Sequence, residues 1–531
     1  MPCCDIHPRR VSAEEQEREL DGDPLDLLPH EQLARLSQVA SFYDGACVLI
    51  TGATGFLGTS LLEKLLRTCT GVSRIYVLIR DKKGVPLRER VRRHLEGVFF
   101  SKTSKTCPDY ISKVVPIAGD CSQPGLGISV ADAEELASKV SVVFHVAATV
   151  RFDESLRIAA NTNVAATREV INLAKRMPNL KAFIHVSSAY SNCTFAKVEE
   201  KFYPPSMTTE ELLKLLSVMD DNQVAQILPK IMGDWPNTYA FTKAIAEDTV
   251  RVHAAGLPAA VIRPSIVVST AEEPLALWVS NMYGPIGVAA GAGLGLMRVF
   301  LADPDVKADL VPVDLVTNAT IACAWDTWQK HSQLPKQEQV VAVPSVYNLV
   351  SGMRHPVTWR DFMRHTEYGT NFPPKAALWC YSLILCRKKW THDLCAIFLH
   401  LVPAIFVDTF LRLRGKKPIL WETYNKVHKF TGVLERFSTN EWEFEEDNVI
   451  TLLQRLGTVD RKLFPFDVKD LDWECLLSIS TRGLRVYLAN DSFDTLDAAR
   501  VKYRRLKIMH YTLISTGVAL ILLLLWWLLF V

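Results

Sequence analysis

The segment "VLITGATGFLGTSLLEKLL" (48–66) restricts the possible folds more than any other part of the chain. An apolar run ends at Thr51, glycines follow at Gly52, Gly55 and Gly58, and an amphipathic, helix-like segment comes next. In such a strand–loop–helix unit the first glycine permits a tight turn, the second lets backbone approach a pyrophosphate, and the third allows close helix packing. The helix N-terminus adds N–H groups and a positive dipole that suit phosphate. We therefore expect a dinucleotide-binding loop formed by Thr51, Gly52, Thr54, Gly55, Phe56, Leu57 and Gly58.

The chain beyond this loop alternates short apolar runs with helix-like stretches up to about residue 270. The apolar runs are "RIYVLIR", "KVVPIAGD", "VSVVFHVAA", "LKAFIHVSSAY" and "PAAVIRPSIVV". Continuous Val/Ile-rich strands separated by helices are typical of a parallel sheet that is covered on both faces. The pattern predicts a doubly wound α/β (Rossmann) domain with its ligand at the carboxyl ends of the strands.

Length and composition indicate what surrounds this domain. At 531 residues the chain is too long for one hydrophobic core, and a net charge of +2 gives no reason to expect nucleic acid. The 12 cysteines and 13 histidines form no metal-ligand pattern, so we expect no metal and a reducing compartment. We expect a flexible leader (1–40), a nucleotide-binding domain with substrate-binding insertions (44–350), a mostly helical C-terminal domain (375–475) and a transmembrane helix (511–531).

The last segment, "YTLISTGVALILLLLWWLLFV" (511–531), carries no charge and is close to the ~20 residues that cross a bilayer. Basic flanks favour the cytosolic side, and this segment is preceded by Arg500, Lys502, Arg504, Arg505 and Lys507. The sequence thus predicts a single-pass C-terminal anchor with the body in the cytosol, with the endoplasmic reticulum favoured over the peroxisome. A second apolar run, "DLCAIFLHLVPAIFV" (393–407), is shorter than a span and predicts a buried or interfacial helix.

The second predicted strand ends in "YVLIRDKK", about twenty residues after Gly58, where the contact to the cofactor ribose is expected. An acidic residue alone at this position binds a 2′-hydroxyl, as in NADH, whereas an arginine accommodates the 2′-phosphate of NADPH. Arg80 comes first, ahead of Asp81, Lys82 and Lys83. This order favours NADPH over NADH.

The stretch "PNTYAFTKAIAE" (236–247) sets Tyr239 and Lys243 four residues apart, on one face of a helix. Alone, this spacing most often marks a solvated helix face. Beside a nicotinamide site it is typical of carbonyl reduction, because the oxygen gains negative charge as hydride attacks carbon and needs a nearby proton donor. We expect the Lys243 ammonium to favour the phenolate and to lower the pKa of Tyr239.

With the glycine loop and the tyrosine–lysine pair in view, the chain resembles the extended short-chain dehydrogenase/reductase superfamily. Further matches are Asp120 in "GD", Ala147 and Ala148 in "HVAATVRF", Asn163 in "NTNV", and the motifs "HVSSAY" and "IRPSIV". The resemblance narrows to the alcohol-forming fatty acyl-CoA reductases, in an arrangement similar to insect-type members, through "TGATGFLG", "HVAATVRFDE", "GPIGVAAGAGLG", "ERFSTNEWEFEEDNV" and "FPFDVKDLDWE". Together these motifs cover most of residues 44–475.

The resemblance implies roles for individual residues. Ser188, in "VSSA", would hold the substrate oxygen, and Ser187 stays open as the alternative. Tyr239 would donate the proton, Lys243 would also bind the nicotinamide ribose, and Asn163 would support a relay water. Further cofactor contacts would come from Asp120, Ala147 and Ala148.

The resemblance also implies a reaction, in which NADPH reduces a long-chain fatty acyl-CoA through an aldehyde to a primary alcohol with release of CoA. The insertion between Ser188 and Tyr239 leaves room for a helix beside the site. Two alternatives stay open. A sterol- or sugar-acting member of the superfamily would not need residues 376–470, and a catalytically silent nucleotide-binding membrane scaffold would be free to lose Tyr239 or Lys243. Acyl chain length and oligomeric state stay open as well.

Overall fold

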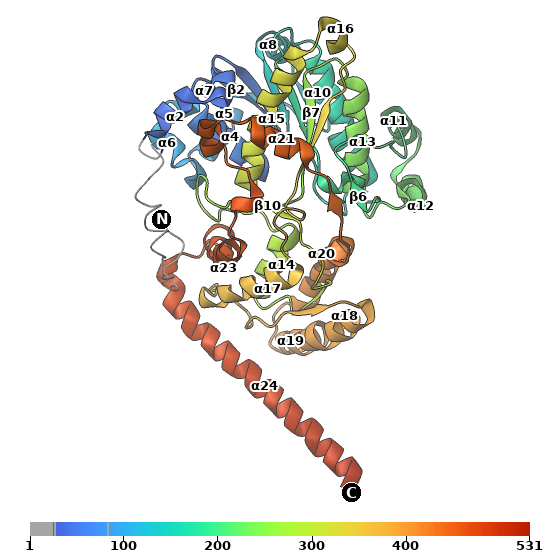
Figure 1. Ribbon diagram of the computed structural model, residues 1–531. Helices are drawn as coiled ribbons and strands as arrows, with labels where there is room; N and C mark the ends of the chain where they lie inside the picture. Colours follow the sequence, from blue (N-terminus) through green and yellow to red (C-terminus); the bar gives the residue numbers. More distant parts are fainter. Residues whose placement is uncertain (1–24, 26–27, 82–83, 531) are drawn as a thin grey trace. The chain divides into compact units, whose positions relative to one another are not determined.

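The computed structural model describes residue 25 and residues 28–81 and 84–530. The chain forms two compact units, and each is assembled from separated segments (Figure 1). Unit 1 comprises Met1–Ala276, Asp309–Pro356 and Trp442–Leu471, and unit 2 comprises Leu277–Ala308, Val357–Glu441 and Asp472–Val531. Neither unit is a continuous stretch of chain. The domain boundaries expected from the sequence stay a prediction.

Unit 1 is built on a seven-stranded sheet with the strand order β11-β7-β5-β4-β1-β2-β3. Every pairing in it is parallel. The strands are β1 (Cys47–Thr51), β2 (Arg74–Ile79), β3 (Val114–Ala118), β4 (Val142–His145), β5 (Ala182–Val186), β7 (Ala259–Pro264) and β11 (Ser345–Leu349). The predicted doubly wound parallel sheet is confirmed, and each predicted apolar run contains one of its strands. The order reverses between β1 and β4, which is where such sheets bind their ligands.

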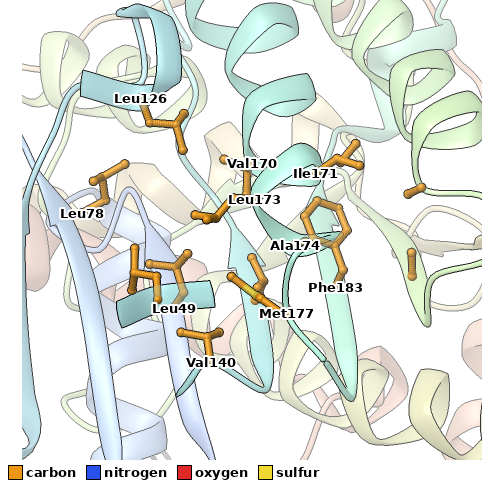
Figure 2. Close-up of a cluster of buried hydrophobic side chains, with 14 of the residues drawn as sticks. Leu49, Leu78, Leu126, Val140, Val170, Ile171, Leu173, Ala174, Met177 and Phe183 are labelled. Carbon is orange, nitrogen blue, oxygen red and sulfur yellow. The ribbon is translucent and has the colours of Figure 1, made fainter. Parts of the chain in front are cut away.

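Helices cover both faces of this sheet, as its buried strands require. Leu49 of β1 and Phe183 of β5 lie in a cluster with Val170 and Ile171 of α10 (Ala166–Ala174), shown in Figure 2. Val143 of β4 belongs to the same cluster. On the other face, α15 (Val313–Gln333) packs against α4 (Phe56–Thr68), β5 and β7. The remaining α-helices of unit 1 include α5 (Leu87–Leu95), α8 (Val130–Lys139), α9 (Leu156–Ala160), α11 (Thr209–Val218), α12 (Asp221–Met232), α13 (Thr238–His253), α21 (Asp447–Arg455) and α22 (Thr458–Leu463).

The expected leader is helical in its last part, whereas residues 1–24 and 26–27 lie outside the described residues. Here α2 (His30–Leu36) is followed by α3 (Gln38–Phe42). The Ser37 side chain caps α3 by accepting from Ala40 N, and its hydroxyl donates to Asp460 at 2.5 Å. The sequence pattern missed these helices because the contact that holds them comes from a residue far along the chain.

Two short sheets bring distant segments of unit 1 together. β8 (Ile266–Val268), which comes directly after β7, pairs with β10 (Leu310–Pro312), and β6 (Lys197–Val198) pairs with β13 (Glu443–Phe444). Residues after 441 therefore complete the same unit that begins with α2.

Unit 2 is mostly helical, as predicted for the C-terminal part of the chain. Its elements include α14 (Gly284–Gly293), β9 (Val299–Leu301), α17 (Trp359–Glu367), β12 (Ile384–Cys386), α18 (Lys389–Ala396), η7 (Ile397–Leu401), α19 (Val402–Leu413), α20 (Leu420–Thr439), α23 (Trp473–Gly483), η9 (Leu484–Leu488) and α24 (Leu496–Phe530). The base of α24 is packed, since Tyr503 clusters with Ala377 and Cys380.

Among the described residues, two helices are long and apolar enough to cross a membrane, Lys389–Leu413 with 25 residues and Phe493–Phe530 with 38. The second contains the predicted anchor. The first contains the run 393–407 and is longer than that run. The expectation of a buried or interfacial helix stays a prediction. Pro403 does not end the helix, because the π-helical turn η7 precedes it and Pro403 lies in the first turn of α19, where a missing N–H costs little.

Candidate active site

The glycine loop connects β1 to α4 as predicted. Gly52 has a φ of +75°, a conformation that favours glycine, and a Cβ there would lie 2.8 Å from Ala147 Cα. A Cβ on Gly58 would lie 2.1 Å from Gly52 O, so only glycine allows this helix to start so close to the turn. Gly55 is the N-cap of α4, whose first turn contains Phe56 and Leu57. Its N–H groups need acceptors outside the helix, and phosphate oxygens are suitable ones.

A chain of hydrogen bonds fixes the adjoining end of β4. Thr51 Oγ1 lies 2.8 Å from His145 Nδ1 and accepts from Ala147 N at 3.2 Å. His145 Nε2 lies 3.0 Å from Thr167 Oγ1, which itself donates to Asn163 O. Burial lowers the pKa of His145 to about 3, so this imidazole is neutral at pH 7. Thr51 therefore holds the backbone at Ala147 beside the glycine turn.

Arg80 and Asp120 lie where the sequence placed them, at the ends of β2 and β3. Both line a cavity of about 570 Å³, within the usual range for ligand sites. Arg90 of α5 lines the same cavity, and its guanidinium donates to Arg80 O. The cavity is lined by Arg80, Asp81, Arg90, Ala118, Gly119, Asp120, Gln123 and Gly127. The sequence analysis missed Arg90. The only sign of it in the sequence was that it is a basic residue on the helix that follows the second strand.

Tyr239 and Lys243 lie on α13 as expected. Asn237 caps the helix by accepting from Ala240 N, which places Tyr239 in its first turn, next to the ring of Phe152 at a centroid distance of 5.6 Å. Lys243 is 2 % exposed, and its Nζ donates to Val186 O at the end of β5 at 2.7 Å. The helix thus presents the phenol at the carboxyl edge of the sheet and ties the ammonium to that edge.

The expected lowering of the Tyr239 pKa by Lys243 is wrong. Burial raises the pKa of Tyr239 to about 12, a hydrogen bond with Ser188 opposes this change, and Glu247 adds to it. Burial also lowers the pKa of Lys243 to about 8, with Glu247 opposing. The Lys243 ammonium donates to Val186 O. The removal of the phenol from water raises the pKa of Tyr239 by more than this ammonium could lower it. The phenol is therefore a protonated hydrogen-bond donor at neutral pH.

The two candidate serines have different partners. Ser188 lies close enough to Tyr239 for its hydroxyl to oppose the rise in the pKa of the phenol, and it caps the short helix η5 (Ala189–Asn192) by accepting from Tyr190 N. Ser187 Oγ donates to Glu247 Oε1 at 2.5 Å. The hydroxyl of Ser188 thus lies with the phenol, whereas that of Ser187 is directed to a buried carboxylate.

Asn163 lies in a π-helical turn, η4 (Asn161–Ala165), between α9 and α10. Its Oδ1 accepts from Thr149 N at 2.9 Å, and its Nδ2 donates to Thr242 Oγ1 at 3.0 Å. The amide therefore joins the loop of Ala147 and Ala148 to α13. The expected support of a relay water stays a prediction.

A buried ion pair that the sequence analysis did not single out lies under these groups. Arg263 of β7 is fully buried and donates to Glu247 of α13 through Nε at 2.9 Å and Nη2 at 2.6 Å. Glu247 also accepts from the Ser187 and Ser191 hydroxyls and from the Asn192 amide. The signal was an arginine inside the apolar run "AAVIRPSIVV", since a charge in a buried strand needs a partner.

The parallel sheet, the glycine turn and the tyrosine–lysine helix define a nicotinamide-dependent oxidoreductase of the extended short-chain dehydrogenase/reductase class. A family profile for NAD binding, described as "Male sterility protein", matches residues 50–320, and a second profile of the same description matches residues 399–491.

Relatives named as fatty acyl-CoA reductases are similar to this chain over most of their length. The chain is 40% identical to fatty acyl-CoA reductase wat of Drosophila melanogaster over 485 residues, 91% of this chain and 92% of that protein. It is 38% identical to fatty acyl-CoA reductase 1 of Rattus norvegicus over 476 residues, with 89% and 90% covered. The chain belongs to the fatty acyl-CoA reductase family.

Solved structures share the fold at lower identity. The terminal R domain of the myxalamid biosynthetic pathway has a TM-score of 0.54 at 21% identity, covering 84% of this chain and 92% of that chain. The reductase domain of a nonribosomal peptide synthetase from Mycobacterium tuberculosis has a TM-score of 0.51 at 17% identity, covering 86% and 99%. These likenesses support the fold assignment.

The buried ion pair generates a stability prediction. Glu247→Gln leaves the Arg263 charge buried with a weaker partner, and breaking such a pair costs about 3–5 kcal/mol. We expect a clearly lower melting temperature in a thermal scan. Glu443→Gln, which removes an exposed pairing with Lys197 at 3.4 Å, is the matched control and should leave the melting temperature unchanged. Equal effects of both changes would contradict the role given to Glu247.

Proposed function

We propose that the protein reduces fatty acyl-CoA to primary fatty alcohol with NADPH as the electron donor. The observation that carries the proposal is the grouping of Tyr239, Ser188 and Lys243 at the carboxyl edge of the sheet. It occurs in a chain that is 36–40% identical to named fatty acyl-CoA reductases over most of its length.

The residues at the glycine loop fit a dinucleotide. The turn at Gly52 and the start of α4 form a cradle that a Cβ would fill at either Gly52 or Gly58. The cavity at the ends of β2 and β3 offers two guanidinium groups, Arg80 and Arg90. Arginine forms charge-assisted bonds with phosphate, so the pair favours a 2′-phosphate and supports NADPH over NADH.

The chain's own residues prepare the substrate carbonyl. When bound, the reduced nicotinamide supplies hydride to the carbonyl carbon, and the oxygen gains negative charge. The hydroxyls of Ser188 and Tyr239 donate hydrogen bonds to that oxygen, and Tyr239 transfers its proton to it. A pKa of about 12 keeps the phenol protonated and ready to donate, which suits reduction better than the reverse reaction.

Lys243 contributes through its position and charge. Its ammonium is held at the end of β5 by Val186 O, one helical turn after Tyr239. There it supplies N–H donors for the hydroxyls of the nicotinamide ribose and stabilises the phenolate that forms when Tyr239 gives up its proton.

Two rounds of the same chemistry convert the thioester to an alcohol. The first hydride and proton give a hemithioacetal, whose C–S bond breaks to release CoA and leave an aldehyde. The second hydride and proton reduce the aldehyde. The balance is one acyl-CoA, two NADPH and two protons consumed, and one alcohol, one CoA and two NADP⁺ formed. No acyl-enzyme is needed.

The proposal extends to location. In α24 the apolar side chains from Tyr511 to Phe530 are mostly exposed, as a lipid-facing helix requires, and basic residues occupy the turns before them. We propose that α24 crosses the membrane once and that the rest of the protein lies in the cytosol. The membrane is that of the endoplasmic reticulum, with the peroxisomal membrane as the alternative. Microscopy of the tagged full chain with markers of both organelles tests this location.

The alternatives make different predictions. A sterol- or sugar-acting enzyme of the same class would oxidise or reduce such substrates in the same assay, and a silent scaffold would bind nucleotide without turnover. The purified full chain with a long-chain acyl-CoA and NADPH should instead yield the alcohol with two NADPH oxidised per product. Free aldehyde as the sole end product would contradict the two-step proposal.

Removal of the phenol hydroxyl tests the proton donor. Tyr239→Phe should lower kcat for alcohol formation by about 10²–10⁴-fold, the usual contribution of a general acid. NADPH binding, followed by fluorescence titration, should stay nearly unchanged. Tyr283→Phe, at an exposed phenol, is the control and should keep full activity. A Tyr239→Phe enzyme with wild-type turnover would remove the phenol from the mechanism.

The arginine pair tests cofactor choice. Arg80→Ala and Arg90→Ala should each raise KM for NADPH by about 10–100-fold, the value of a charge-assisted bond, and should leave KM for NADH unchanged. Arg88→Ala removes an exposed arginine of the same helix and should change neither constant. If KM for the two nucleotides rose together, the pair would not read the 2′-phosphate.

The pH dependence tests Lys243. The pKa of Lys243 is lowered to about 8, so the ammonium is present below that pH and is lost as pH rises through it. kcat/KM for NADPH reports the free enzyme and should therefore fall above pH about 8 with one titrating group. A profile that stays level to pH about 10, the ordinary pKa of lysine, would exclude this role for the ammonium.

A further inference from the structure

The 25-residue helix formed by α18, η7 and α19 buries three polar or ionisable side chains and exposes most of its large apolar ones. Five residues at intervals of four are buried against unit 2: His392, Ala396, His400, Ala404 and Asp408. Three of the five are polar or ionisable. A helix on the surface of a soluble protein has the opposite arrangement.

The buried polar residues are bound to other elements of unit 2. His400 Nε2 accepts from Arg298 N at 3.0 Å, and its Nδ1 lies 3.2 Å from His428 Nε2. Asp408 accepts from the backbone N–H groups of Ile419, Leu420 and Trp421, which begin α20. These bonds hold one whole face of the helix against the protein.

The opposite face of the helix is large, apolar and exposed. Phe406 is 72 % exposed and Phe398 62 %. We use the name outer apolar face for Trp390, Leu394, Ile397, Phe398, Ile405, Phe406, Val407, Phe410 and Leu413, all of which are exposed. A contiguous apolar surface of this kind marks an interaction site.

Exposed basic residues lie at both ends of this face. Lys388 and Lys389 precede the helix or begin it, and Arg412, Arg414, Lys416 and Lys417 end it or follow it. The acidic residues nearest to them in sequence are Asp393, Glu422 and the buried Asp408. Lys389 also contacts Glu435 at 3.3 Å. Trp390 and Trp421 are exposed near the two ends, where a membrane interface favours indole rings. Cations beside an apolar face complement the anionic head groups of a bilayer.

We propose that the outer apolar face lies in the head-group region of a bilayer that contains anionic phospholipid, with the α18–α19 helix parallel to the membrane. If the helix crossed the membrane, it would move away from the rest of unit 2. The hydrogen bonds of His400 and Asp408 with unit 2 would then be broken. The α24 helix, rooted in the same unit by Tyr503, keeps that unit at the bilayer. The helix is therefore a second, peripheral membrane contact, and the inference does not depend on the proposed reaction.

Photocrosslinking in vesicles tests the inference on the full chain. A benzophenone amino acid replaces Phe406, and the protein is reconstituted in phosphatidylcholine vesicles with and without phosphatidylserine. We expect lipid adducts at this position, with about fivefold more when phosphatidylserine is present, the factor expected for about one basic residue near an anionic surface. The same amino acid at Val218, which is 75 % exposed in unit 1, is the control and should give no lipid adduct.

Trypsin added outside the vesicles distinguishes a parallel helix from a crossing one. In molecules whose body faces outward, a parallel helix leaves both the Lys388–Lys389 site and the Lys416–Lys417 site on the outer side, so both should be cut. Protection of one of the two sites would show a crossing helix and overturn the inference. Adducts from position 406 to protein instead of lipid, or a lipid yield equal to that of the Val218 control, would overturn it as well.

Discussion

The geometry of the candidate site depends on the buried pair of Arg263 and Glu247. Arg263 comes from the sheet and Glu247 from the helix that carries Tyr239 and Lys243, so their two hydrogen bonds set the depth and rotation of that helix against β7. Glu247 also binds Ser187, next to the serine that meets the phenol. Because a buried charge is stable only with its partner, the arrangement has one favourable position. The geometry of the candidate site therefore has an electrostatic origin.

The same carboxylate influences the chemistry above it. Glu247 lies one helical turn beyond Lys243 and two beyond Tyr239, and it favours the protonated form of both. Burial acts in opposite directions on the two groups, raising the pKa of the phenol and lowering that of the ammonium. At neutral pH the Tyr239 phenol is therefore protonated, and the Lys243 ammonium is within about one pH unit of its pKa.

Local pattern was sufficient for part of the site and insufficient for the rest. The glycine turn, Arg80 and the spacing of Tyr239 and Lys243 could be predicted, because each depends on residues near one another in sequence. Ser187 binds Glu247 and Ser188 lies beside Tyr239 because of the way in which the end of β5 packs against α13, and the local sequence does not contain this packing. Arg90 reaches the cavity only because α5 returns to the end of β2. The raised pKa of Tyr239 reflects burial by distant segments, which spacing does not contain.

The interleaving of the two units has a consequence for biosynthesis. Residues 442–471 complete unit 1. In this segment Asp460 accepts a hydrogen bond from the Ser37 hydroxyl, and β13 pairs with β6. A nascent chain that has left the ribosome only as far as residue 441 therefore exposes the α2–α3 region and the edge of β6 without their native cover. Long sequence separation of this kind slows folding, because the segments near the N-terminus stay without these native contacts until residues 442–471 have been made.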